Sequence, residues 1–184
     1  PVVKPVPTHQ VIDELDINFK DQGMEDDEWK ELIEKMINFT PKTASKLFFN
    51  QLFGGRQPKA VFGDLLAVML NNSMYTYKVA GPQAGIEKTI MKKVVQLAGY
   101  PDLADGTIAP GGSMCNFMAL VMARDSVVKD IPYAGVNSKM TLYTSKESHY
   151  SILKNAAFAG IGRDQVRFIK TNEKGEMDTN HLND

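Results

Sequence analysis

The chain has 184 residues, 43% of them hydrophobic, and its 21 basic and 22 acidic side chains give a formal net charge of −1. This composition is sufficient for a globular core, but it offers no basic surface for nucleic acid or an anionic membrane and no apolar run long enough to span a bilayer. Cys115 is the single cysteine, which excludes an intrachain disulfide and is typical of a cytoplasmic protein.

The first half of the chain predicts helices joined by loops. Residues 1–10 are rich in proline and predict an extended arm. Asp26 or Asp27 is the expected N-cap of a helix whose apolar side chains recur every three or four residues, namely Trp29, Leu32, Ile33, Met36 and Ile37. Three further segments are expected to form an irregular loop, a buried helix and a second loop, over residues 47–55, 62–70 and 71–77 respectively.

The second half of the chain alternates helices with short β-branched runs. The expected elements are helices over residues 86–97 and 113–129, a strand over 140–144, a helix over 149–159 and a strand over 166–170. A helix between two such strands is typical of a parallel sheet covered by helices, so we expect an α/β fold. We divide the chain into an arm and helical segment over residues 1–84 and an α/β part over residues 85–184.

A glycine turn precedes the expected helix at residue 113, in the sequence IAPGGSMCN. The first amide groups of a helix have no partner within the helix and carry a partial positive charge, and glycine lets an anion approach them closely. The amides of Gly111, Gly112, Ser113 and Met114 therefore predict a phosphate site. The alternative is a helix that begins after a tight turn and binds nothing. Cys115, taken alone, is expected to be a small buried residue.

His149 follows the first expected strand, within the sequence TSKESHYS. Ligands of parallel sheets bind beyond the carboxyl ends of the strands, so His149 and the glycine turn can face the same crevice. The alternative is a histidine that only decorates the start of the following helix. His9 and His181 have no evident partners and are expected to be solvated.

Five blocks in a fixed order give the sequence a family resemblance: FFNQL, LNNSMYTY, PGGSMCN, MAR and YTSKESHYSI. From about Phe48 to its end, the chain resembles the group II pyridoxal-phosphate-dependent amino-acid decarboxylases, specifically the branch that acts on glutamate, cysteine sulfinate and aspartate. The resemblance implies the large domain of a fold-type I enzyme, similar to aspartate aminotransferase. It also implies a homodimer in the cytoplasm with pyridoxal 5'-phosphate as cofactor, and residues 85–184 as the first part of the cofactor-binding domain.

The resemblance also assigns roles to individual residues. Gly112, Ser113, Met114 and Cys115 would hold the phosphate, and His149 would stack on the pyridine ring as a catalytic residue. Cys115 stands where the family usually has serine, which removes one good hydroxyl donor. The residues that would contact the carboxylate-bearing substrate are Gln51, Leu52 and Phe53.

Two functional groups of the family lie farther along the chain than residue 184. They are the lysine that binds the cofactor as a Schiff base, within a His-Lys pair, and the aspartate that pairs with the pyridine nitrogen. No His-Lys pair occurs here. We therefore expect residues 1–184 to be the N-terminal part of the enzyme, and we expect this part to be inactive alone.

Phe53 bears on the choice of substrate. Animal-type glutamate decarboxylases usually have serine at this position, whereas phenylalanine resembles the cysteine sulfinate and aspartate enzymes. A larger side chain favours a substrate that is one methylene shorter than glutamate, unless Phe53 points into the core. Such a difference is worth about 1–3 kcal/mol. Lys78 is a second departure, because relatives commonly have glutamate there, and the sequence does not say whether it alters the entrance to the site.

Two other functions remain open at this point. The chain could belong to another fold-type I enzyme, such as an aminotransferase or an aromatic amino-acid decarboxylase, although the FFNQL block differs in the aromatic enzymes. It could also be a truncated scaffold that keeps the fold and binds partners without catalysis. The rest of the reading frame distinguishes these, since the enzyme requires the downstream lysine and aspartate.

Overall fold

The computed structural model describes residues 2–3, 6–18, 21–50, 52 and 54–184. The chain divides into two compact units, residues 1–79 and residues 80–184. The predicted functional division at residues 84 and 85 stays a prediction. No helix in the described residues is both long and apolar enough to cross a membrane.

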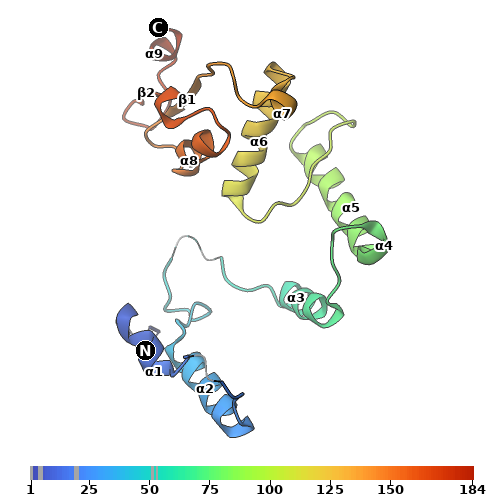
Figure 1. The fold of residues 1–184 in the computed structure, drawn as a ribbon, viewed down its shortest axis with the longest axis vertical. Helices are drawn as coiled ribbons and strands as arrows, with labels where there is room; N and C mark the ends of the chain where they lie inside the picture. The colour runs from blue at the N-terminus through green and yellow to red at the C-terminus, as the bar shows by residue number, and fades with distance from the viewer. Residues whose placement is uncertain (1, 4–5, 19–20, 51, 53) are drawn as a thin grey trace. The chain divides into compact units, whose positions relative to one another are not determined.

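The first unit consists of helices and loops (Figure 1). The expected extended arm is wrong in part, because the chain already turns into a 3₁₀ helix before residue 11. The N-cap of the second α-helix is Glu25 rather than an aspartate, and the Glu28 carboxylate accepts a hydrogen bond from the Glu25 amide at 3.4 Å. The helices are η1 (Thr8–Gln10), α1 (Val11–Leu15), α2 (Asp26–Phe39), α3 (Pro58–Leu70) and α4 (Tyr77–Ala80), which reaches into the second unit.

Helix α3 forms where a helix was predicted, but the expectation that it is buried is wrong. Pro58 occupies the first turn, and the Gln57 side chain accepts a hydrogen bond from the Lys59 amide at 2.7 Å. Its apolar side chains stay exposed, Phe62 by 68% and Met69 by 82%. A helix that is apolar all round is expected to be covered on several sides, and the described residues supply no such cover.

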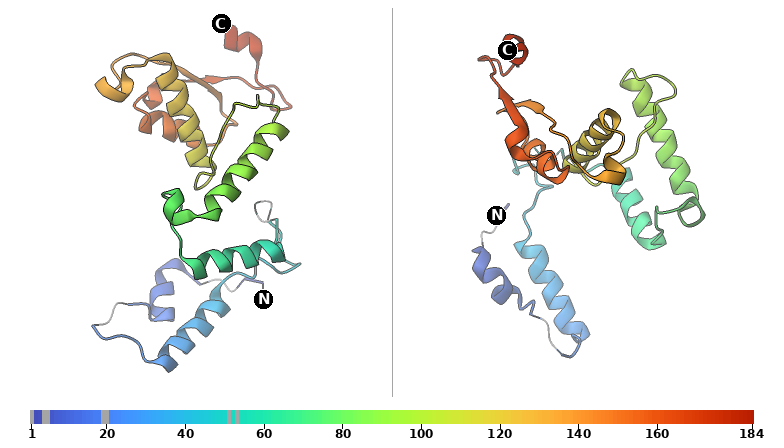
Figure 2. Two further views of the ribbon diagram at one scale, coloured as in Figure 1. Left: turned by 90° about the vertical axis from the view of Figure 1, so that its right-hand side faces the viewer. Right: turned by 45° about the horizontal axis from the view of Figure 1, so that its top comes forward.

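The second unit contains the remaining elements and the parallel sheet (Figure 2). Strands β1 and β2 pair in parallel, with Leu142 opposite Val166 and Ser145 opposite Ile169. The predicted βαβ pattern is therefore confirmed, with only two strands in the described sheet. The elements are α5 (Pro82–Leu97), α6 (Gly112–Val127), α7 (Ile131–Ala134), β1 (Leu142–Ser145), α8 (Ser151–Phe158), η2 (Arg163–Gln165), β2 (Val166–Ile169) and α9 (Thr179–Asn183).

Helix α6 packs against α8, and α8 also contacts η2. Gly160 follows the end of α8 with φ +74°, and a Cβ there would lie 2.9 Å from Val136 Cγ2, so this turn requires glycine. Buried polar residues in this unit are Thr144 and Ser145 on β1 and Ser151 and Asn155 on α8. The buried apolar residues are Ala80, Val95, Ile131, Ala156, Ala159, Val166 and Ile169.

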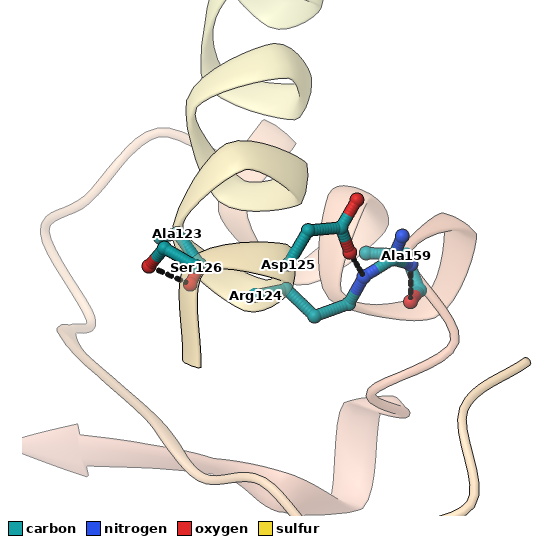
Figure 3. A network of polar contacts seen from close by, with 5 residues as sticks. All are labelled: Ala123, Arg124, Asp125, Ser126 and Ala159. Carbon is teal, nitrogen blue, oxygen red and sulfur yellow. Dashed lines mark hydrogen bonds and ion pairs between the residues drawn. The ribbon is translucent and has the colours of Figure 1, made fainter. Parts of the chain in front are cut away.

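Arg124 links the C-terminal part of α6 to the end of α8. Figure 3 shows its guanidinium between two acceptors. Its Nε donates to the Asp125 carboxylate at 2.7 Å and its Nη1 donates to the Ala159 carbonyl at 2.5 Å. The Arg124 side chain is 14% exposed, so both bonds are largely shielded from water.

Replacing Arg124 with alanine should lower the free energy of unfolding. Hydrogen bonds to a charged group contribute about 1.5–3 kcal/mol, so we expect a loss of that size in urea unfolding of the full-length protein. Ser126→Ala is the matched control, because its exposed hydroxyl donates to the Ala123 carbonyl of the same helix (Figure 3). Equal losses in the two variants would show that Arg124 does not hold the helices together.

Candidate functional site

The glycine turn is the point at which α6 begins. Gly111 is the N-cap with φ +96°, in the left-handed region that favours glycine. Its amide donates to the Ala109 carbonyl at 2.8 Å, and its own carbonyl accepts hydrogen bonds from the amides of Met114 at 3.1 Å and Cys115 at 3.2 Å. The amide groups of Gly111 and Met114, both predicted to face a phosphate, are therefore engaged within the turn.

The amides of Gly112 and Ser113 are the ones left available. Neither has an acceptor within the described part of the chain. A Cβ built on Gly112 would meet no atom within 4 Å, so the backbone there is open to an approaching ligand. Two free amides at the positive end of a 16-residue helix form a site for an anion.

The side chains of the turn are exposed. Ser113 is exposed, and Met114 is 42% exposed. The expectation that Cys115 is buried is wrong, because it lies on the exposed first turn of α6 as a free thiol. The pattern of apolar residues in α6 did not show which side its first turn presents to solvent.

His149 lies in the loop between β1 and α8, beyond the carboxyl end of the strand. Its ring is exposed and lies 4.2 Å from the Tyr150 ring, tilted by 35°. Lys154 Nζ lies 4.6 Å from the centre of that Tyr150 ring. His149 therefore presents a planar polar ring at the edge of the sheet where parallel α/β proteins bind ligands.

Hydrogen bonds connect His149 to the helix that follows the glycine turn. The Nδ1 atom of His149 lies 2.8 Å from the Ser151 hydroxyl, and the Asn116 amide donates to that hydroxyl at 2.9 Å. The Asn155 side chain donates to the Ser113 carbonyl at 2.9 Å. These contacts bring the first turn of α6 and the first turn of α8 together, as the sequence predicted for the glycine turn and His149.

Ser151 and Asn155 were not predicted as site residues. Both are buried, with exposed fractions of 1% and 4%. Asn155 lies four residues after Ser151, so both lie on the same face of α8. Two polar residues on the apolar face of a helix are the signal that could have identified them, because a buried polar group needs a hydrogen-bond partner.

Glu87 holds the segment that leads into the glycine turn. Its carboxylate accepts hydrogen bonds from the Thr107 hydroxyl at 2.9 Å and the Ile108 amide at 3.1 Å. These bonds, chiefly the one from the Ile108 amide, lower the pKa of Glu87 below its ordinary value of 4.5, against a smaller opposing effect of desolvation. The ionised carboxylate thus anchors the chain three residues before Gly111.

The anchor predicts a pH dependence. Because the pKa of Glu87 is lower in the folded state, its contribution to stability is fully present above pH 4.5 and is lost as the pH falls through the lowered value. The stability difference between the protein and a Glu87→Gln variant, measured by urea unfolding in a pH series, should therefore shrink on acidification. A difference that stays constant or grows below pH 4.5 would contradict this role.

The predicted substrate residues lie in the first unit. Gln51 and Phe53 are outside the described residues. Leu52 is 80% exposed, and its amide donates to the Asn50 side chain at 2.8 Å. Among the described residues, no group of three or more His, Cys, Asp or Glu side chains is placed to bind a metal ion.

The chain is similar in sequence to curated decarboxylases. The chain is 39% identical over 165 residues to cysteine sulfinic acid decarboxylase of Rattus norvegicus, which covers 89% of the chain and 33% of the relative. It is 37% identical over 165 residues to the acidic amino acid decarboxylase GADL1 of Xenopus tropicalis, and the aligned residues cover 89% of this chain and 32% of the relative. The chain thus spans about a third of the length of these relatives.

Solved structures match the fold. The crystal structure of mouse CSAD matches 98% of the chain and 38% of its own length, with a TM-score of 0.92 and 36% identity. The structure of Oryza sativa TDC with PLP and tryptamine matches 99% of the chain and 40% of its own length, with a TM-score of 0.83. At 23% identity, that second likeness supports the fold alone.

A family model extends over nearly the whole chain. The model is that of the pyridoxal-dependent decarboxylase conserved domain, and it matches residues 8–184. The match includes the glycine turn, His149 and the buried serine that joins them. This chain belongs to the pyridoxal-dependent decarboxylase family.

Proposed function

We propose that the chain is the first part of an enzyme that removes the α-carboxyl group of an acidic L-amino acid as CO2, with pyridoxal 5'-phosphate as cofactor. The observation that carries the proposal is the glycine turn, in which the amides of Gly112 and Ser113 have no acceptor in the described structure. Asn116, on the first turn of the same helix, is linked to His149 through the Ser151 hydroxyl. Family membership and the names of the relatives support the same reaction.

The chemistry of the turn fits the phosphate group of this cofactor. A phosphate ester needs several hydrogen-bond donors and a positive electrostatic environment, and a helix N-terminus provides both. The donors here are the amides of Gly112 and Ser113 and the Ser113 hydroxyl, and no side chain fills the space at Gly112. Cys115 is a weaker donor than the serine found in relatives, so the backbone supplies most of the binding.

His149 would hold and orient the aromatic part of the cofactor. When bound, the cofactor supplies a protonated pyridine ring that takes up the electrons released as CO2 leaves. The exposed imidazole of His149 can stack on such a ring, while its polar edge remains available to a carboxylate. Positioning of this kind contributes to catalysis because the bond that breaks must be aligned with the ring's π system.

The substrate proposed is aspartate or cysteine sulfinate in preference to glutamate. The names of the two curated relatives support an acidic substrate. The bulky Phe53, next to Gln51 and Leu52, would favour the shorter side chain. A methylene in a binding pocket is worth about 1–3 kcal/mol, so we expect preference rather than exclusion.

Turnover by the full-length protein on the three acids, side by side, tests the proposal. We expect kcat/KM to be roughly tenfold or more higher for cysteine sulfinate or aspartate than for glutamate, and no CO2 release without added pyridoxal 5'-phosphate after dialysis. Replacing Phe53 with serine should reduce the difference in kcat/KM between glutamate and the two shorter substrates. Failure to release CO2 from any of the three acids would contradict the function, and a preference for glutamate would contradict only the substrate assignment.

The assembly proposed is a homodimer. Many large apolar side chains remain exposed within the described residues, among them Leu103 at 98% and Phe49 at 90%. Faces of this kind are usually covered by further chain or by a partner subunit. The mass of the full-length protein in solution, from light scattering, should equal that of two chains, and a monomer that binds the cofactor fully would contradict the assembly.

A further inference from the structure

The hydrogen bonds of His149 fix which ring nitrogen carries the proton. The backbone amide of Ser151 donates to Nδ1 of His149 at 3.2 Å. A backbone N–H can only donate, so Nδ1 acts as an acceptor in this contact. A neutral imidazole has one protonated and one bare nitrogen, and Nε2 must then carry the proton.

The hydroxyl of Ser151 is directed the same way by Asn116. The Asn116 side-chain amide donates to Ser151 Oγ at 2.9 Å, and Nδ1 of His149 lies 2.8 Å from the same oxygen. A hydroxyl has one hydrogen and two lone pairs, so Oγ can accept from Asn116 and still donate. Because Nδ1 is already an acceptor for the Ser151 amide, the hydroxyl hydrogen is the one donated to Nδ1. The chain of donors therefore runs in one direction, from Asn116 through Ser151 to His149.

Burial makes this arrangement selective. Ser151 is 1% exposed and Asn116 is half-buried, so water competes little for the hydroxyl. The opposite tautomer, with a proton on Nδ1, could still donate to the Ser151 hydroxyl oxygen, but it would leave the buried amide of Ser151 without an acceptor. Unsatisfied buried donors are costly, which favours the tautomer with the proton on Nε2.

We infer that Ser151 and Asn116 are positioning residues that hold His149 in the Nε2–H tautomer, so that His149 offers a donor, not a bare nitrogen, to an anionic oxygen of the ligand. No partner of Nε2 occurs among the residues that the structure describes. An N–H at this nitrogen suits a carboxylate acceptor and not a second donor. The role of the anionic ligand rests on the proposed function, whereas the tautomer follows from the protein alone.

Nitrogen NMR of the full-length protein without cofactor tests the tautomer. The probe is protein labelled with ¹⁵N in histidine, recorded at about pH 8.5, above the ordinary histidine pKa of about 6.5. The His149 signals are assigned by their loss in His149→Ala. We expect a protonated Nε2 and a bare Nδ1 that accepts a hydrogen bond. A protonated Nδ1 would overturn the inference.

Substitutions distinguish the effect of the Ser151 hydroxyl on His149 from that of the other residues of the loop. In Ser151→Ala the Nδ1 resonance should move toward that of a bare nitrogen without a hydrogen bond, and Asn116→Ala should move it less, in the same direction. Ser148→Ala is the matched control, because Ser148 lies in the same loop as His149 and its hydroxyl contacts Ser145, the last residue of β1. An unmoved Nδ1 resonance in Ser151→Ala would refute the role of Ser151. If that variant does not fold, the Asn116→Ala spectrum decides.

A kinetic readout connects the tautomer to the proposed reaction. In the holoenzyme, Ser151→Ala should lower kcat/KM on the order of tenfold, the effect of losing one neutral hydrogen bond. If the unaltered protein does not bind pyridoxal 5'-phosphate, the proposed function fails while the NMR result still stands. If it binds the cofactor and Nδ1 is protonated, only this inference fails.

Discussion

Substituting Gly112 with valine should abolish most of the protein's affinity for pyridoxal 5'-phosphate. The valine side chain would occupy the open space where no atom lies within 4 Å, and it would keep a phosphate from the Gly112 and Ser113 amides. Hydrogen bonds to a charged group are worth about 1.5–3 kcal/mol each, so losing two predicts a fall on the order of a hundredfold or more. Equilibrium titration of the dialysed full-length protein, followed by cofactor absorbance, measures the change.

The backbone at Gly112 makes this variant informative, because its φ lies outside the left-handed region and a valine there brings no such strain. Gly85→Val is the matched control, since Gly85 also lies in the first turn of a helix with open space beside it. The control should keep the affinity of the unaltered protein. Unchanged affinity in Gly112→Val would leave the alternative of a tight turn that binds no phosphate.

Replacing His149 with alanine should shift the absorption band of the bound cofactor and slow turnover by on the order of a hundredfold. The first effect is expected because the stacked ring is removed, and the second because a poorly oriented substrate reacts more slowly. His149→Phe separates the two, since phenylalanine keeps a planar ring and loses the polar edge. Relative to His149→Ala, we expect His149→Phe to recover most of the normal absorption band of the bound cofactor but little of the turnover rate.

His9→Ala is the control for the loss of an imidazole, because His9 is exposed in the 3₁₀ helix of the other compact unit. It should match the unaltered protein in spectrum and turnover. A His149→Ala enzyme with a normal band and normal kcat would mean that His149 only decorates the start of α8.

Local patterns predicted α5, α6, α8 and both strands of the second unit, but not the short helices α7 and α9. The β-branched runs and the helix between them led to a parallel pairing that the structure confirms, with the strands within two residues of their expected bounds. The expected burial of α3 failed because an apolar composition predicts the need for cover and does not say what provides it. The N-cap of α2 was missed because the choice among consecutive acidic residues depends on backbone angles.

The candidate site could be proposed from the sequence where it depends on contiguous residues. The glycine turn and His149 each belong to a short motif, and their role as a cofactor site stays a prediction. The pairing of Asn116 with Ser151, and of Asn155 with the Ser113 carbonyl, depends instead on how α6 crosses α8. Contacts between residues 35 or more positions apart follow from packing, which the sequence pattern alone does not specify.

A crystal structure of the full-length protein with pyridoxal 5'-phosphate tests the central claim most directly, through the distances from the phosphate oxygens to two amide nitrogens. Hydrogen-bonded N···O distances of about 2.7–3.2 Å to both Gly112 and Ser113 are the predicted result. A phosphate held by other residues, with the Gly112 and Ser113 amides bound to water or to protein groups, would contradict it.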